Sequence, residues 1–286
     1  MPYHLRSTDQ LVEAWTSWHL NFAGHSTNTK EDDQYREELR GRIRDLAAGV
    51  GLNAAYTCRR WPGNRDLENL LLYNGGIRRS DFGDRRFLRF EKRTANELQP
   101  CPQLPDAVAY VRYEVSEHII PSNGKTLVKC EPVACQKIDL EDVGRLWRVL
   151  KGAKWHTGEG VSNGAELRVD LVIWAPKKLN LIGRIKNILD GFLSSLHHRS
   201  ESDQDLDDVI ARLVTKYQWE DRHEVRRMLL EKEYAVLGHC HTPRGHSKSK
   251  PGSLKWSPDD HRLAHCQVVH ETSPDGAWRI EGRLFS

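Results

Sequence analysis

Two acidic residues at the start of one short helical segment are the strongest candidates for chemistry. Asp66 and Glu68 lie two residues apart, where an expected strand gives way to a helix. Both carboxylates can reach one divalent cation if the backbone there is not yet helical, and Asp81 or Asp84 could complete an oxygen-rich Mg²⁺ site. Such a metal serves phosphodiester cleavage by activating water and neutralising the leaving oxygen. These four acids are therefore the candidate catalytic residues, with Asp66 and Glu68 as the metal ligands.

The same acids also have a structural interpretation. Asp66 can cap the helix, and Glu68 favours the positive N-terminal end of the helix. Acidic first turns are common in helices, which favours this interpretation. A third carboxylate at the same point would favour the metal site instead.

Two strand–turn–helix units must position any such site. The second is the better specified: alternation over 167–175 predicts a largely buried strand, which Pro176 ends because proline lacks the N–H that the ladder needs. Apolar residues at steps of three and four over 181–196 then predict an amphipathic core helix. The first unit, 53–74, has the same order of strand, turn and short helix. We therefore expect the two units to be structurally equivalent.

The remaining pattern predicts an α+β chain with mixed sheets and flanking helices. Strands are expected at residues 53–59, 87–93, 107–115, 126–133, 265–271 and 278–285, and helices at 9–18, 31–48, 139–151, 200–217 and 221–237. The segment 238–252 is rich in Gly, His, Pro, Ser and Lys and predicts a mobile loop.

The first unit resembles RusA-type Holliday-junction endonucleases. These enzymes carry an Asp-x-Asp-Asn-Leu turn after a strand, then a Lys and an Asp on the following helix. Asp66, Glu68, Asn69 and Leu70 match the turn, with Glu replacing one Asp, but Leu72 stands where the Lys would be.

The second unit matches the complementary part of the same motif. Lys186 and Asp190 match the two helix positions, whereas Asn180, Ile182 and Gly183 stand where the turn has its acids and Asn. Each unit thus keeps the part that the other has lost. The helix also resembles one in uncharacterised bacterial proteins that carry Lys-x-x-x-Asp-Gly, which implies no function.

Because RusA-type enzymes are homodimers, the resemblance implies two fused RusA-like halves in one chain. We expect an N-terminal half at 1–137 and a C-terminal half at 138–286, the latter with a helical insertion at 200–237 and a mobile loop at 238–255. The resemblance also implies Mg²⁺ as cofactor and nucleic acid as partner.

Basic residues beside both turns suit phosphate contact. The candidate nucleic-acid-binding residues are Arg59, Arg60, Arg65, Arg78, Arg79, Lys177, Lys178 and Lys186. The net charge of +3 and pI of about 8.5 permit such a partner without requiring one, and solvated basic loops remain an alternative.

Histidines and cysteines near the C-terminus raise the question of zinc. The residues are His239, Cys240, His241, His246, His261, His265, Cys266 and His270. No Cys-x-x-Cys pair or regular His spacing is present, so we expect no zinc site. The six scattered cysteines fit reduced thiols, no apolar run approaches the roughly 20 residues of a membrane span, and we expect a cytoplasmic protein.

Three functions remain open at this point. We expect a nucleic-acid-binding protein, or a subunit of a nucleoprotein complex, with impaired or absent nuclease activity. The first alternative is an active Mg²⁺-dependent, structure-specific endonuclease. The second is a protein-interaction subunit without nucleic-acid contact, docking through the acidic segment 201–208 and the basic segment 244–255.

Overall fold

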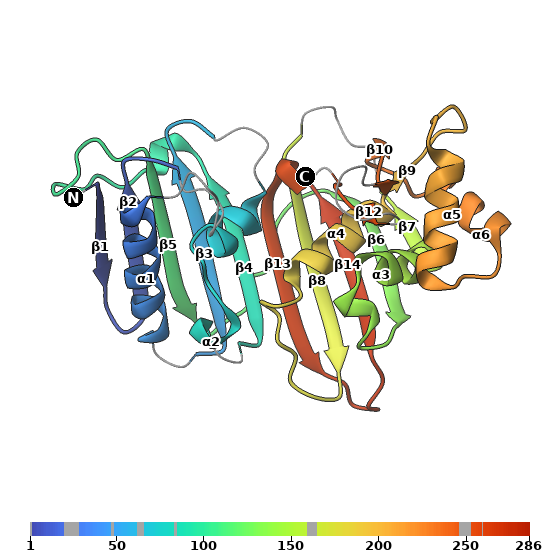
Figure 1. Cartoon of the computed structure of the whole chain (residues 1–286). Helices are drawn as coiled ribbons and strands as arrows, with labels where there is room; N and C mark the ends of the chain where they lie inside the picture. The colour runs from blue at the N-terminus through green and yellow to red at the C-terminus, as the bar shows by residue number, and fades with distance from the viewer. Residues whose placement is uncertain are drawn as a thin grey trace.

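A single ten-stranded sheet forms the centre of the molecule (Figure 1). The computed structural model describes residues 2–19, 29–46, 49–61, 66–82, 85–158, 165–245, 253–258 and 260–286. The sheet contains both parallel and antiparallel pairs, and helices pack on it, which confirms the expected α+β class. No helix in these described ranges combines the length and apolar character that crossing a membrane requires.

The strands follow a pattern that reads the same from either edge. Their order is β1 (Tyr3–Ser7), β2 (Leu11–Thr16), β5 (Ala109–Ser116), β3 (Gly51–Cys58), β4 (Phe87–Arg93), β13 (Leu263–Thr272), β8 (Leu167–Ala175), β14 (Arg279–Phe285), β6 (Thr126–Ala134) and β7 (Trp155–Thr157). From each edge inward there are three antiparallel pairings and then one parallel pairing. The antiparallel pair β4–β13 joins the two sides.

This order places β3 and β8 in corresponding positions, as expected for two equivalent strand–turn–helix units. The two sides divide between β5 and β6 along the chain. The expected boundary at residue 137 therefore falls after β6, which lies with the C-terminal strands because it pairs with β14.

The main helices α1 (Lys30–Arg44), α3 (Val143–Lys151) and α4 (Ile185–Ser195) lie on one face of the sheet (Figure 1). A capping box between Thr29 and Asp32 starts α1. The expected core helix over 181–196 is confirmed by α4, which is shorter and runs from Ile185 to Ser195. Leu181 and Ile182 precede α4 and Leu196 follows it, but the whole predicted apolar face is buried: Leu181, Ile182, Ile185, Ile188, Leu189, Phe192, Leu193 and Leu196. The close approach of Phe192 to Gly282 of β14 leaves no room for a side chain there.

The N-terminal prediction of a helix over 9–18 is wrong. The segment forms β2, a strand in a hairpin with β1. Val12, Ala14 and Trp15 are all buried because both faces of this strand are covered, so the alternation that marks a half-buried strand is absent. The spacing of Leu11, Val12 and Trp15 then imitates a helix.

The expected helical insertion lies beyond the edge formed by β7 (Figure 1). It contains α5 (Leu206–Tyr217) and α6 (Arg222–Leu230), which share a separate apolar cluster with Trp147 of α3. The second helix ends at Leu230, seven residues before the expected end at 237. Within the expected mobile loop, the described part contains short strands β10 (Gly238–His239), β11 (Arg244–Gly245) and β12 (Leu254–Lys255); β10 pairs with β9 (His197–His198) and β11 with β12.

Smaller helical elements complete the described chain. They are α2 (Arg79–Phe82), a π-helical turn (Asn69–Tyr73) and 3₁₀ turns at Ala95–Glu97, Asp139–Glu141 and Asp260–Arg262.

Candidate functional site

The turn after β3 carries the acidic motif and is held firmly against the sheet. Leu67 and Leu71 are buried, and the Tyr113 hydroxyl of β5 donates a 2.6 Å hydrogen bond to the Leu71 carbonyl oxygen. The expected short helix is a π-helical turn, Asn69–Tyr73. Such turns are frequent at functional sites. The Asn69 side-chain nitrogen donates to Asp66 Oδ2, so the motif's own amide orients its first carboxylate.

The helix α4 supplies the second set of polar groups. Lys186 and Asp190 lie one turn apart, so their side chains share one side of the helix. Ile185, Ile188 and Leu189 are buried in the core and fix the rotation of the helix about its axis. The core packing of α4 therefore determines where Lys186 and Asp190 point.

The two sets meet at one point, which we call the acidic centre: Asp66, Glu68, Lys186 and Asp190. Lys186 Nζ lies 3.0 Å from Glu68 Oε1, 3.5 Å from Asp190 Oδ1 and 3.6 Å from Asp66 Oδ2. Glu68 and Lys186 are 118 residues apart in sequence. The parts of the motif that each half retains thus assemble into one centre.

Burial shapes the electrostatics of this centre. Loss of solvent raises the pKa of Asp190 to about 7; the Lys186 ammonium opposes this rise, and the Glu68 and Asp66 carboxylates add to it. Burial likewise raises the pKa of Glu68, which is only 1% exposed, again against the effect of Lys186. Three carboxylates around one ammonium leave a formal charge of −2 when all are ionised, which attracts a divalent cation.

Buried oxygens at the centre and beside it are available as ligands. Among the described residues, Glu68 Oε2 and Asp190 Oδ1 of the centre and Asn69 Oδ1 beside it are buried without a hydrogen-bond partner. Carboxylate and amide oxygens are the ligands that Mg²⁺ takes in proteins. Both expected metal ligands, Asp66 and Glu68, belong to the acidic centre. The oxygen-rich side chains of the centre fit a Mg²⁺ ion.

The third carboxylate of the centre is Asp190, whereas Asp81 or Asp84 was expected. Asp81 is buried and its oxygens are engaged by Arg40 at 2.9 Å, by Arg44 at 3.7 Å and by the Arg78 N–H at 2.7 Å. It therefore ties α2 to α1. Asp84 lies outside the described residues.

The candidate phosphate-binding residues do not form one group. Arg59 and Arg60 follow β3, whereas Lys177 and Lys178 follow β8, and all four are exposed. Because β3 pairs parallel with β4, β4 antiparallel with β13 and β13 parallel with β8, the strands β3 and β8 run in opposite directions. Their C-terminal ends therefore lie at opposite ends of the strands of the sheet.

The other basic candidates differ in their surroundings. Arg78 is exposed. Lys178 lines a cavity of about 400 Å³ with Arg85 and Arg86. Lys186 belongs to the acidic centre rather than to the exposed basic residues. Arg65 and the side chain of Arg79 lie outside the described part.

The sequence did not identify Asp190 as a site residue, although it matched the helix part of the motif. The Lys-x-x-x-Asp spacing of Lys186 and Asp190 marked the helix, but nothing in the sequence showed that these side chains lie next to Asp66 in the fold. Comparisons with protein-family models, with curated proteins and with solved structures found no match to this chain.

Proposed function

We propose that the protein binds nucleic acid and cleaves phosphodiester bonds with a divalent cation at the single acidic centre. The observation that carries this proposal is the convergence of Asp66, Glu68 and Asp190 on Lys186. The expectation of impaired nuclease activity rested on each half lacking part of the motif. Because the two remnants meet in space, the absence of one part from each half is no longer an argument against activity.

The residues have separable roles in this proposal. Asp66, Glu68 and Asp190 would hold Mg²⁺, which when bound lowers the pKa of water and neutralises a leaving oxygen. The Lys186 ammonium limits repulsion among the carboxylates and can contact a non-bridging phosphate oxygen. With its pKa at about 7, Asp190 exchanges a proton near neutral pH, so protons and the metal compete for this carboxylate.

One observation favours a second function, nucleic-acid binding without cleavage. The Lys186 ammonium is within 3.6 Å of an oxygen of each of the three carboxylates, where it takes the position of a cation. If the ammonium is not displaced or shifted, the centre is structural, and exposed basic residues such as Arg59, Arg60, Lys177 and Lys178 would alone contact the nucleic acid. Once all three carboxylates are ionised, the charge count favours the metal, because one ammonium leaves two negative charges uncompensated.

A four-way DNA junction tests both functions in one preparation. Binding should weaken by more than about tenfold between about 50 and about 200 mM salt, because phosphate contacts release counterions. Mg²⁺ should support cleavage by the wild-type chain but not by Asp66→Asn. The control is Asp106→Asn, an exposed acid outside the centre.

The outcomes separate the candidates. Salt-dependent binding by both variants with no cleavage by the wild type would establish the second function. Salt-insensitive or undetectable DNA binding would contradict both the nuclease and the nucleic-acid-binding function and favour the protein-interaction alternative.

A further inference from the structure

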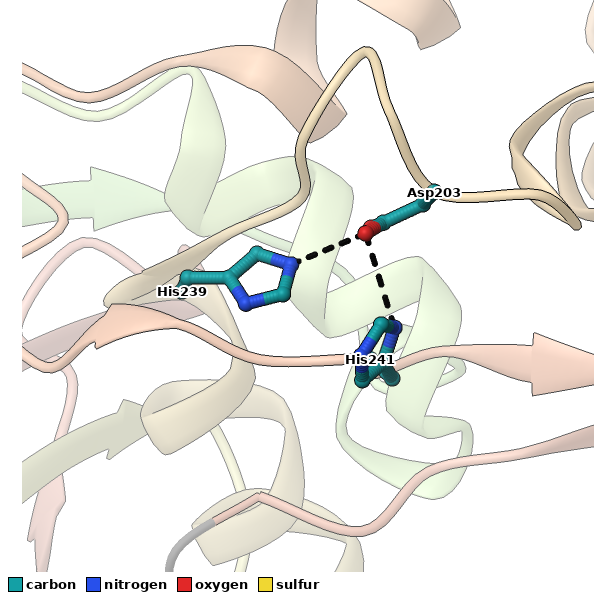
Figure 2. A group of neighbouring side chains, drawn as sticks. All are labelled: Asp203, His239 and His241. Atoms are coloured by element: carbon teal, nitrogen blue, oxygen red, sulfur yellow. Dashed lines mark hydrogen bonds and ion pairs between the residues drawn. The ribbon is translucent and has the colours of Figure 1, made fainter.

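A histidine pair and a carboxylate meet at the base of the helical insertion. Asp203 lies between β9 and α5, His239 is in β10, and His241 follows it by two residues. Asp203 Oδ1 is 3.0 Å from His239 Nε2 and 3.6 Å from His241 Nδ1. Figure 2 shows both rings directed at the same carboxylate. One ligand atom from each residue lies within 4.8 Å of the other two.

The separations between Asp203 and each histidine are close to those around a shared metal ion. Zinc binds imidazole nitrogen at about 2.0–2.1 Å and carboxylate oxygen at about 2.0–2.2 Å, so neighbouring tetrahedral ligands lie about 3.4 Å apart. The two observed separations bracket that value. An ion could therefore enter with small side-chain movements and without backbone rearrangement.

The carboxylate is oriented by groups behind it. Asp203 Oδ2 accepts hydrogen bonds from Arg199 Nε at 2.6 Å and from the Ser200 N–H at 3.1 Å, which leaves Oδ1 facing the histidines. Arg199 is fully buried and also donates to Asp205 and to the Pro243 carbonyl oxygen. Such outer contacts are typical of metal-ligating carboxylates.

The charge of this neighbourhood also suits a cation. Asp203 and Asp205 together exceed the single charge of Arg199. With neutral imidazoles, the local charge is −1 before a metal binds.

The histidines are placed by backbone pairing between segments 41 residues apart in sequence. The parallel pair β9–β10 sets His239 beside His198, and the Cys240 N–H donates to the His198 carbonyl oxygen at 3.0 Å. Residues 239 and 241 are two apart on an extended segment and therefore point to the same side. Their side chains are 41% and 66% exposed, so an ion has access from solvent and can keep a water ligand.

We infer that Asp203, His239 and His241 form a binding site for a divalent transition-metal ion of the zinc type. Imidazole nitrogen selects such ions, whereas Mg²⁺ prefers oxygen. The ion would join the segment before α5 to the segment after α6 and so close the base of the insertion. This site does not depend on the acidic centre. It departs from the expectation of no zinc, which considered only the His and Cys residues and not Asp203.

Zn²⁺ titration of the full chain against a competing chelator tests the inference. Wild type should bind one Zn²⁺, and His239→Ala and His241→Ala should each weaken binding by at least about tenfold. His223→Ala, an exposed histidine of α6, should bind as wild type does. Zn²⁺ should also raise the melting temperature of wild type but not of the two ligand variants.

Cys240 lies between the two histidines and is the alternative ligand. Cys240→Ser should retain Zn²⁺ binding, because the Cys240 thiol faces the Ser257 carbonyl oxygen at 3.9 Å. Loss of binding in Cys240→Ser, equal binding by the histidine variants, or no binding by wild type would each overturn the inference.

Discussion

Replacing Lys186 with Met removes the only ammonium of the acidic centre and keeps most of its apolar stem. The change leaves Glu68, which is 1% exposed, beside Asp66 and Asp190 without a positive partner 3.0 Å away. Breaking a buried ion pair from one side costs about 3–5 kcal/mol. The Lys186 side chain is 36% exposed, so solvent screening reduces this, and we expect a loss of roughly 2–4 kcal/mol in the free energy of unfolding at pH 8.

The loss should depend on pH and on Mg²⁺ in a way that packing effects do not. At pH 5, Glu68 and Asp190 can bind protons, because burial has already raised the pKa of each, so the loss should shrink. At pH 8, Mg²⁺ should raise the free energy of unfolding of Lys186→Met by about 2.7 kcal/mol once the Mg²⁺ concentration is 100 times its Kd, because the ion takes the place of the ammonium. Urea unfolding at both pH values, with and without Mg²⁺, measures these terms.

A surface lysine provides the matched control. Lys154→Met removes a 70% exposed ammonium that pairs with Glu131, and it should change stability by less than about 0.5 kcal/mol at either pH. A Lys186→Met loss below about 1 kcal/mol, or one that neither pH nor Mg²⁺ alters, would refute the account of this centre.

Three further predictions concern single residues. Leu189→Ala, in the buried face of α4, should lower the free energy of unfolding by about 2–5 kcal/mol in urea melts, and a loss below about 1 kcal/mol would contradict the core placement. The pKa of Asp190 is about 7 in the folded state, against 3.8 for the free side chain, so the free energy of unfolding should fall by up to roughly 4 kcal/mol as pH rises from about 4 to about 7. Asp190→Asn should flatten this slope in pH-dependent melts, and an unchanged slope would assign the pH dependence to another group. Asp81→Asn should cost about 2–4 kcal/mol of stability because buried Asp81 pairs with Arg40, yet leave the cleavage rate of the folded protein intact, and a lost rate would return Asp81 to the catalytic set.

The sequence predicted the elements whose patterns are long and one-sided. The strand β8 begins and ends as expected, and every residue of the apolar face predicted over 181–196 is buried, because alternation and helical spacing report directly on a half-covered surface. The helix itself begins only at Ile185, since residues 181–184 form a turn. The hairpin strand β2 was assigned wrongly because burial of both faces removes that signal.

The two candidate sites could be predicted only in part. The sequence supplied Asp66, Glu68 and the Lys186–Asp190 spacing, but their meeting depends on the β4–β13 pairing, which no local pattern specifies. Proximity in sequence favoured Asp81 as the third acid, whereas the arginines of α1 engage it instead. In the same way Asp203 joins His239 only through the fold, 36 residues away along the chain.

Mg²⁺-dependent cleavage of a four-way DNA junction by Asp190→Asn tests the central claim most directly, because Asp190 comes from the half opposite Asp66. Single-turnover rates would be compared for wild type, Asp66→Asn, Asp190→Asn and the exposed control Asp208→Asn of α5. A composite centre predicts that the Asp66 and Asp190 variants each lose at least about a hundredfold in rate, or about 2.7 kcal/mol of barrier, while the control is unchanged. Wild-type cleavage that Asp190→Asn leaves intact, or no cleavage by wild type at all, would contradict it.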